Sequence, residues 1–237
     1  MELFFTSNID PLASFTLPEE ESKHLIKVLR YGTGDKIALT DGSGKFYTAE
    51  IENTDARHCL VKVTGVYGKQ VDRKYHLHIA IAPPKNNERF EWFLEKTSEI
   101  GIDEITPLNC RRSERKELKL DRMNKILISA LKQSWNGKLP LLHPMTDFKK
   151  YIENPGEGSR FICTMDADNF LGDVYVPGNN ALILIGPEGD FHEEEIELAK
   201  KSGFIPVSLG KSRLRTETAG LMACAVLTTM NAVTKKI

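Results

Sequence analysis

The chain has 237 residues and a formal net charge of −1, with 41% apolar and 27% charged residues. This composition is typical of a globular protein of one or two domains and excludes a disordered or membrane-embedded chain. Because the charge is balanced, any polyanionic partner must be met by a local basic patch. The sequence has no apolar run that could span a bilayer and starts without the basic region of a signal peptide, so we expect a cytoplasmic protein.

The cysteines predict no covalent or metal framework. Cys59, Cys110, Cys163 and Cys224 lie far apart and show no C-x-x-C spacing. We expect reduced and mostly buried thiols, and neither a disulfide framework nor a zinc site.

The first part of the chain, residues 1–71, is predicted to form a small β domain. Its strands are expected at residues 3–6, 35–40, 45–51 and 59–66, which are rich in β-branched and aromatic residues. Asp41-Gly-Ser-Gly44 predicts a hairpin turn, because glycine readily adopts a positive φ. A helix is expected over residues 18–30, with acids in its first turn and a base at its end. The pattern predicts a closed or nearly closed barrel with one docked helix.

The predicted helix carries three basic side chains, His24, Lys27 and Arg30, and is followed by Tyr31-Gly-Thr-Gly34. Cations beside an aromatic ring and a glycine turn suit RNA backbone and a stacked base. On these residues alone a solvated helix face is the more ordinary interpretation.

After a polar linker at residues 68–74, strands and helices alternate, which predicts a mainly parallel sheet covered on both faces. We expect strands at residues 76–82, 104–108, 160–165, 181–185 and 204–209, and helices at 88–100, 121–135, 193–202 and 219–230. His76 and His78 share one face of the first of these strands. Because two histidines without a third ligand are a weak metal signal, we expect no metal site.

Two glycine-containing connections follow neighbouring strands. Ile185-Gly-Pro-Glu-Gly-Asp-Phe-His192 leads into a helix, and Leu209-Gly-Lys-Ser212 follows the last strand. Neither contains the dinucleotide-binding or P-loop pattern. Asp190 with Glu193 is the pattern of a helix capping box. The two connections could together cradle one small ligand, and we favour this pocket over two independent turns.

Three arginines, Arg111, Arg112 and Arg115, form the densest arginine cluster of the sequence. Their forked side chains suit phosphates, although the mixed charge of the segment also fits a solvated loop. Spacing alone identifies no Ser/His/Asp triad, no Cys/His pair and no paired carboxylates. The residue pattern thus predicts a two-domain α/β protein with a ligand pocket.

Several motifs occur in a fixed order: His24-x-x-x-Val28-Leu-Arg30, Lys85 with Glu95–Gly101, Gln133-Ser134 before Pro140, Ile185–Gly189, and Leu209-Gly with Leu214-Arg-Thr-Glu-Thr-Ala219. Together they resemble the ribosomal RNA small subunit methyltransferase E family of the SPOUT superfamily, which methylates N3 of one uridine in 16S rRNA. The resemblance covers essentially the whole chain. Gly-Pro-Glu-Gly followed by Leu-Arg-Thr-Glu-Thr-Ala at this spacing is its most specific part.

The resemblance implies a fold and a cofactor. It implies a PUA-like β-barrel RNA-binding domain at residues 1–71 and a SPOUT methyltransferase domain at 72–237, whose parallel sheet carries a trefoil knot. S-adenosylmethionine would lie in three loops, and the protein would be a homodimer acting on the 16S rRNA of the small ribosomal subunit. The implied cofactor-binding residues are Thr164, Met165, Ile185, Gly186, Pro187, Glu188, Gly189, Leu209, Gly210, Leu214 and Thr216. The helix from Ala219 to Met230 would pack in the knot and at the dimer interface.

With this fold in view, the residue pattern leads to a hypothesis for the RNA contacts and for the mechanism. RNA contacts would come from His24, Lys27, Arg30, Arg111, Arg112 and Arg115. Arg215 would stabilise negative charge on the uracil carbonyls, and Glu217 would orient Arg215 or accept the N3 proton. The alternative is that both only cap the following helix.

The chain departs from the family pattern at two places. Asp190 stands where the family usually has a second glycine, and we expect Asp190 to cap the following helix. Ser212-Arg213 stands where Arg-Ile is usual. Two other functions stay open at this point: a non-catalytic RNA-binding or ribosome-assembly protein of the same fold, and a tRNA ribose methyltransferase, which the N-terminal barrel disfavours.

Overall fold

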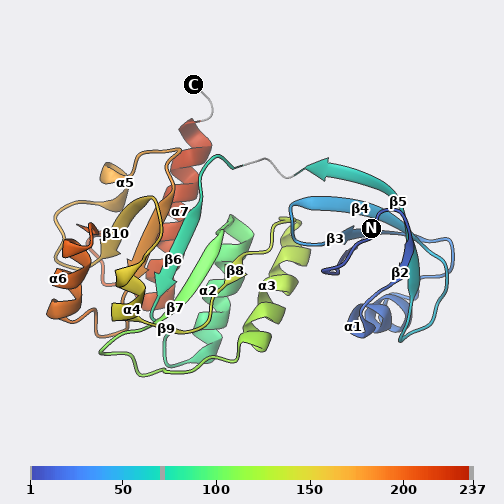
Figure 1. Ribbon diagram of the computed structural model, residues 1–237, viewed down its shortest axis with the longest axis horizontal. Helices are drawn as coiled ribbons and strands as arrows, with labels where there is room; N and C mark the ends of the chain where they lie inside the picture. The colour runs from blue at the N-terminus through green and yellow to red at the C-terminus, as the bar shows by residue number, and fades with distance from the viewer. Residues whose placement is uncertain (1, 70–72, 235–237) are drawn as a thin grey trace. The chain divides into compact units, whose positions relative to one another are not determined.

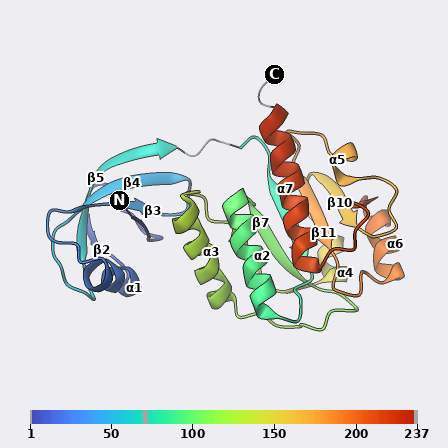
Figure 2. The same cartoon turned by 180° about the vertical axis from the view of Figure 1, so that it is seen from behind.

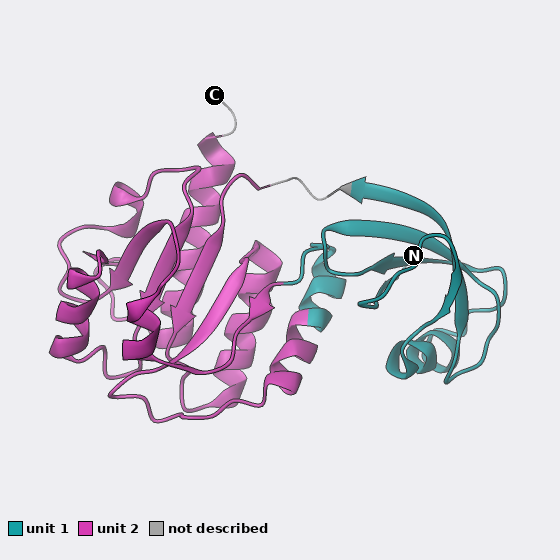
Figure 3. Ribbon diagram, in the orientation of Figure 1, with its two compact units in different colours: residues 1–72, 128–139 teal, residues 73–127, 140–237 magenta. Residues whose placement is uncertain are grey.

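The computed structural model describes residues 2–69 and 73–234. The chain forms two compact units (Figure 3): residues 1–72 with 128–139, called unit 1, and residues 73–127 with 140–237, called unit 2. The predicted division between residues 71 and 72, and residues 70–72 of the predicted linker, lie outside the described residues.

Unit 1 contains a curled five-stranded sheet (Figure 1). Its strands are β1 (Leu3–Phe5), β2 (Ser14–Thr16), β3 (Lys36–Thr40), β4 (Lys45–Ile51) and β5 (Leu60–Lys69), in the order β1-β3-β4-β5-β2. The predicted hairpin is confirmed, because β3 and β4 pair antiparallel and Gly42 and Gly44 have φ values of 78° and 90°. The three-residue strand β2 was not predicted, since it is too short to show an alternating pattern.

The predicted helix at residues 18–30 is two helices of different type. An α-helix, α1 (Glu19–Lys23), continues into a π-helical turn, η1 (His24–Val28). The wider turn is closed by a hydrogen bond of 3.1 Å from Leu29 N to His24 O. Arg30 follows with φ of 61° and ends the helix early, so the single α-helix expected here was wrong.

The segment 128–139, which is distant in sequence, completes unit 1. Leu139 N donates to Gly42 O, and Gly44 N donates to Gly137 O, each over 2.9 Å. The ring of Phe46 stacks on Trp135 with centroids 5.9 Å apart. This segment therefore anchors the turn between β3 and β4 through backbone pairing and aromatic packing.

Unit 2 is built on a parallel sheet in the order β12-β10-β11-β6-β7-β8, with β9 paired to β7. Its strands are β6 (Leu77–Ile81), β7 (Glu104–Asn109), β8 (Leu141–Leu142), β9 (Thr146–Asp147), β10 (Ser159–Cys163), β11 (Ala181–Ile185) and β12 (Ile205–Val207). All residues of β11 are buried, as expected for a strand covered on both faces. The predicted parallel sheet is confirmed.

Helices cover both faces of this sheet. The helices after residue 73 are α2 (Asn87–Ile100), α3 (Leu120–Ser134), α4 (Phe148–Glu153), α5 (Leu171–Val174), α6 (Glu193–Lys201) and α7 (Thr216–Thr234). Helices α2 and α7 lie side by side on one face (Figure 2), and α4 and α6 lie on the other. The short elements β8, β9, α4 and α5 were not predicted. Within the described residues, no helix is long and apolar enough to cross a membrane.

Helix α7 reaches the middle of the sheet from its edge. The preceding strand β12 pairs only with β10 among the described strands, whereas α7 packs on β6, β11 and α2. Gly220 makes this approach possible, because a Cβ there would stand 2.5 Å from the Phe93 ring of α2. The connection between β12 and α7 therefore passes beside the carboxyl ends of β10 and β11.

Candidate functional site

A cavity of about 530 Å³ lies where β10 and β11 end, a volume in the range of small-ligand pockets. Three segments of the chain line it: Cys163–Met165, Ile185–Asp190 without Gly189, and Leu209–Ala219 without Lys211, Glu217 and Thr218. Every residue predicted to bind the cofactor lines this cavity except Gly189. The structure thus brings together three segments that are far apart in sequence.

The first glycine of the segment Ile185–Asp190 packs closely against its own loop. A Cβ on Gly186 would stand 3.1 Å from the Phe191 ring and backbone. Thr216 Oγ1 donates to Gly186 O over 3.1 Å, which ties the third segment to the second. The Glu188 carboxylate accepts a hydrogen bond from Lys85 N over 3.0 Å, which ties this loop to the segment that precedes α2.

Asp190 is not the cap of the following helix, so that expectation was wrong. The N-cap of α6 is His192, whose side chain accepts from Glu194 N while Glu195 bonds back to His192 N at 2.9 Å. Asp190 instead adopts a left-handed conformation, with φ of 61°. Such a φ is adopted readily by glycine and less readily by Asp or Asn.

Two arginines of the predicted RNA-binding cluster hold the loops of the cavity. Arg112 donates to Gly189 O over 2.8 Å and to Phe191 O over 3.2 Å. Arg115 donates to Pro84 O over 3.1 Å and to Lys85 O. Their guanidinium groups are therefore engaged with backbone carbonyls around the cavity.

Arg111 is placed differently from its neighbours. Its side chain is exposed and lies 3.0 Å from the Glu194 carboxylate, while its backbone N–H donates to Glu195 over 2.8 Å. The buried Glu195 thus links Arg111 to the start of α6.

A second cavity, of about 660 Å³, shares a wall with the first. The shared residues are Arg213, Leu214 and Arg215, which line both cavities. Arg89 and Trp92 of α2 line the second cavity only. A ligand in one cavity and a ligand in the other would therefore both lie beside the Arg213–Arg215 segment.

Glu217 borders the second cavity and is 6% exposed. Its Oε1 lies 3.8 Å from Arg89 Nε, and its Oε2 is buried without a hydrogen-bond partner among the described residues. The sequence paired Glu217 with Arg215, whereas the structure places Arg89 beside this carboxylate. The sequence analysis missed Arg89 and Trp92, because they belong to no motif and look like ordinary residues of a helix surface.

The cavities hold no activated thiol. Cys163 lines the first cavity, and burial, with a smaller effect of the Asp190 charge, raises the pKa of its thiol far above the usual range. All four cysteines are buried, which confirms the burial expected from the sequence. The chemistry available at the site is thus that of positioned cations, one buried carboxylate and backbone groups.

The remaining predicted RNA-binding residues lie in unit 1. His24 Nε2 is 3.1 Å from the Glu2 carboxylate, and Lys27 and Arg30 are exposed. The exposed Val28 lies between them in sequence, so the π-helical turn and the residues that directly follow it present two cations and one apolar side chain to solvent. Among the described residues, no ion pair involves the side chains of Lys27 or Arg30.

The two strand histidines of unit 2 lie away from both cavities. His78 pairs in register with Glu104 on β7, and His76 lies 3.2 Å from the same carboxylate. Burial lowers the pKa of His78 to about 4, so its imidazole is neutral at pH 7.

Comparison with sequence families gives two matches. A family described as an RNA methyltransferase domain matches residues 71–228, and one described as an RNA methyltransferase PUA domain matches residues 17–64. A ribosomal RNA small subunit methyltransferase E from Synechocystis is 30% identical; the match covers 90% of this chain and 72% of that protein.

Solved structures give the same result at the level of the fold. A probable rRNA-methyltransferase from Porphyromonas gingivalis superposes with a TM-score of 0.91 at 42% identity, covering 99% of this chain and all of that one. A ribosomal RNA small subunit methyltransferase E from Neisseria gonorrhoeae, solved bound to S-adenosyl methionine, superposes with a TM-score of 0.88 at 28% identity. That match covers 97% of this chain and 98% of the other.

Proposed function

The chain belongs to the RNA methyltransferase family, and from this premise we propose that it transfers the methyl group of S-adenosylmethionine to N3 of a uridine in 16S rRNA. The observation that carries the proposal is the pair of cavities that share the Arg213–Arg215 wall. For an in-line displacement the methyl donor and its acceptor must be in direct contact, and ligands in two cavities that share the lining residues Arg213–Arg215 can meet beside this segment.

The first cavity fits the cofactor. Apolar side chains of Met165, Ile185 and Leu214 can contact an adenine ring, and the glycines of the loops leave backbone N–H and C=O groups accessible to polar atoms. The position also agrees with the rule that ligands of open parallel sheets bind beyond the carboxyl ends of the strands. When bound, S-adenosylmethionine supplies an electrophilic methyl group on a sulfonium.

The second cavity fits a uracil base taken out of its strand. Trp92 is 38% exposed at the edge of this cavity and offers a face for stacking. Aromatic stacking of an unpaired base is the usual way in which proteins hold single-stranded RNA. The base edge would then face the methyl donor directly, with Arg215 beside both.

The chain's own groups can assist loss of the N3 proton. Arg215, which lines both cavities, can stabilise the negative charge that develops on the uracil carbonyls. Glu217 has one buried carboxylate oxygen without a hydrogen-bond partner among the described residues and can accept the proton, while Arg89 Nε lies 3.8 Å from its other oxygen.

RNA outside the reacting base is assigned to unit 1. Its exposed cations Lys27 and Arg30, with His24, would contact phosphates of the small-subunit RNA. Of the arginine cluster in unit 2, Arg111 is exposed and would exchange its ion pair with Glu194 for such a contact, whereas Arg112 and Arg115 are assigned to holding the cavity loops. Since small ribosomal subunits are the substrate, we assign the protein to the cytoplasm.

A homodimer is part of the same proposal. Helices α5 and α7 line an apolar groove that includes Met222 and Val233, which are 39% and 63% exposed. A second copy of the chain would cover this groove. Sedimentation of the tag-free protein should show a dimer, and Met222→Glu should shift it to monomer; a wild-type protein that sediments as a monomer at all concentrations would contradict the dimer.

A matched pair of variants in α2 tests the proposed base cavity. Trp92→Ala should lower methyl transfer to small subunits at limiting RNA about 5- to 150-fold, because stacking on one aromatic contributes about 1–3 kcal/mol. Ile100→Ala, an exposed apolar residue of the same helix, should leave transfer unchanged. Calorimetry with S-adenosylmethionine should give equal affinities for all three proteins.

The outcomes separate the functions. Cofactor binding with no transfer by the wild type to any ribosomal RNA would sink the proposed reaction, and no cofactor binding would instead favour a non-catalytic RNA-binding protein. Equal transfer by Trp92→Ala and Ile100→Ala would show that the base does not bind in the second cavity.

A further inference from the structure

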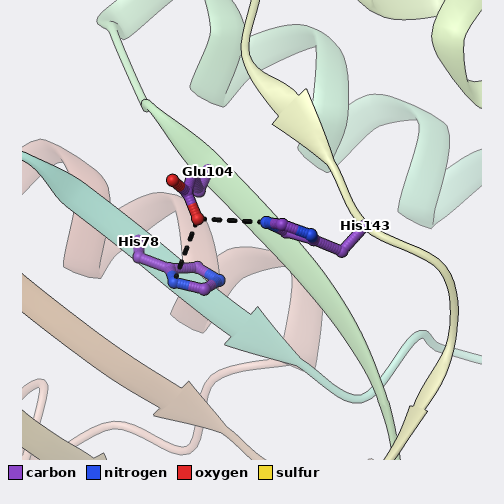
Figure 4. A group of neighbouring side chains, drawn as sticks. All are labelled: His78, Glu104 and His143. Atoms are coloured by element: carbon purple, nitrogen blue, oxygen red, sulfur yellow. Dashed lines mark hydrogen bonds and ion pairs between the residues drawn. The ribbon is translucent and has the colours of Figure 1, made fainter. Parts of the chain in front are cut away.

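Three of the six histidines converge on one carboxylate at the amino ends of β6 and β7. Glu104 Oε2 lies 3.0 Å from His143 Nε2 and 3.5 Å from His78 Nδ1, and its Oε1 lies 3.2 Å from His76 Nε2. Figure 4 shows the side chains of His78 and His143 both directed at the same carboxylate oxygen of Glu104.

The backbone of the sheet holds these donors in place. His78 and Glu104 are register partners on the adjacent parallel strands β6 and β7. His143 directly follows β8, and its N–H donates to Ile105 O over 2.9 Å. The carbonyl of His76 accepts from Ala181 N over 2.9 Å. All of the donors are thus fixed on hydrogen-bonded strands or at their ends, where a site can be preorganised.

The donor geometry matches a compact coordination shell. One ligand atom from each of His78, Glu104 and His143 can be chosen so that all lie within 4.8 Å of one another. Zinc binds imidazole nitrogen and carboxylate oxygen at about 2.0–2.2 Å, which places neighbouring donors of a tetrahedron about 3.3 Å apart. The separations of 3.0 and 3.5 Å from Glu104 Oε2 bracket that value.

Hydrogen bonds behind the cluster orient its most buried ring. His78 Nε2 is 2.8 Å from Thr106 Oγ1 and 3.5 Å from Tyr151 Oη. With the proton on Nε2, where it bonds Thr106, the lone pairs of His78 Nδ1 and Glu104 Oε2 face each other. A cation between them would remove this repulsion, and an outer hydrogen bond of this kind is the usual support of a metal-binding histidine.

We propose that His78, Glu104 and His143 form a three-ligand binding site for one divalent transition-metal ion of the zinc class. A donor set of two imidazoles and one carboxylate binds zinc and neighbouring transition metals in preference to calcium or magnesium. The cluster lies toward the amino ends of the strands, whereas the proposed cofactor cavity lies beyond the carboxyl ends of β10 and β11. The ion would therefore join β6, β7 and the segment after β8 and take no part in methyl transfer.

The test is a titration of tag-free, metal-stripped protein with Zn²⁺ by calorimetry, and with Co²⁺ by visible absorption. We expect one ion per chain, a Co²⁺ spectrum of four-coordinate intensity, and a rise in melting temperature with Zn²⁺, since a ligand of the native state stabilises it. His143→Gln and Glu104→Gln should each weaken Zn²⁺ binding by more than about 100-fold, and Thr106→Val by about 10- to 100-fold.

His58→Gln is the matched control, because His58 is an exposed histidine of unit 1 and should not affect binding. Affinity for S-adenosylmethionine should be the same in every variant. If Glu104→Gln fails to fold by circular dichroism, the half-exposed His143→Gln carries the comparison alone. Absence of Zn²⁺ binding by the wild type, or equal binding by His143→Gln and the wild type, would overturn the proposal.

Discussion

Arg215 is the residue that connects the two cavities, since it lines both of them. The side chain is exposed in the described structure and is therefore free to contact RNA as well as the reacting base. Glu217, two residues later, is buried and faces Arg89. The start of α7 thus carries one exposed cation, which can contact RNA and the base, and one buried carboxylate, which can accept the proton.

We predict that Arg215→Ala loses methyl transfer while still binding the cofactor. Removal of one donor to a developing oxyanion typically lowers kcat about 10²- to 10³-fold. Lys211→Ala is the control, because Lys211 lies in the same loop but lines neither cavity. Single-turnover transfer to small subunits measures the effect; turnover of Arg215→Ala within twofold of Lys211→Ala would remove Arg215 from the reaction.

Asp190 gives a prediction about backbone conformation. At its φ of 61°, we expect Asp190→Val to lower the free energy of unfolding by about 1–3 kcal/mol, because β-branched residues are strained there. Asp190→Gly should change it by less than about 1 kcal/mol, since glycine adopts this φ freely but loses the bond from Phe191 N. Urea unfolding of the two variants is the measurement, and equal stability would contradict the strained conformation.

The sequence identified residues of the first cavity better than those of the second. The family motifs mark the loops directly, so every expected cofactor residue but Gly189 lines the cavity. Arg89 and Trp92 carry no motif and reach the site only because α2 packs against α7. A contact made by the packing of two distant helices leaves no local pattern, so it could not be predicted from spacing.

At the scale of elements, the packing of α7 on α2 sets the position of the Arg215–Glu217 segment. Gly220 lies where any larger residue would meet Phe93 and Ile81, and both of those side chains are fully buried. Closely packed interiors tolerate added volume poorly. The start of α7, and with it the wall between the cavities, depends on this contact.

Gly220→Ala should therefore destabilise unit 2. Its new Cβ would lie 2.5 Å from the Phe93 ring, and overpacking costs about 1–3 kcal/mol, of which the better helix propensity of alanine offsets about 1 kcal/mol. Thermal unfolding measures the loss. Adding Phe93→Leu should recover part of it, and a double variant no more stable than Gly220→Ala would argue against this clash.

Long elements were predictable and short ones were not. The helices α2, α3, α6 and α7 and the strand β4 repeat their apolar residues over enough positions to show a period, and β11 is a continuous apolar run. The elements β2, β8, β9, α4 and α5 are too short for that. The change from α1 to a π-helical turn depends on which carbonyl Leu29 N reaches, and the period of the sequence does not encode that choice.

At the scale of the whole molecule, the chain combines a PUA-like unit and a SPOUT-type parallel sheet, as the resemblance implied. The division is not a single cut, because residues 128–139 belong to unit 1 (Figure 3). The sequence could not show this, since the end of α3 continues a helix whose start belongs to unit 2. The proposal assigns RNA backbone to unit 1 and methyl transfer to unit 2.

The salt dependence of RNA binding tests this division of labour. A double variant, Lys27→Ala with Arg30→Gly, should lower the slope of log affinity against log salt concentration by about 1.4, at about 0.7 for each lost phosphate contact with single-stranded RNA. Glycine is chosen because Arg30 has a positive φ. Lys62→Ala, an exposed lysine of β5, is the control. An unchanged slope in the double variant would move the RNA contacts elsewhere.

The central claim is that this chain methylates N3 of a uridine in 16S rRNA. Small subunits incubated with the protein and isotope-labelled S-adenosylmethionine should yield labelled 3-methyluridine on digestion and mass spectrometry. The same nucleotide should arrest reverse transcription, because a methyl group on N3 blocks base pairing. Label recovered only as a ribose-methylated nucleoside, or only in RNA other than 16S, would contradict the account.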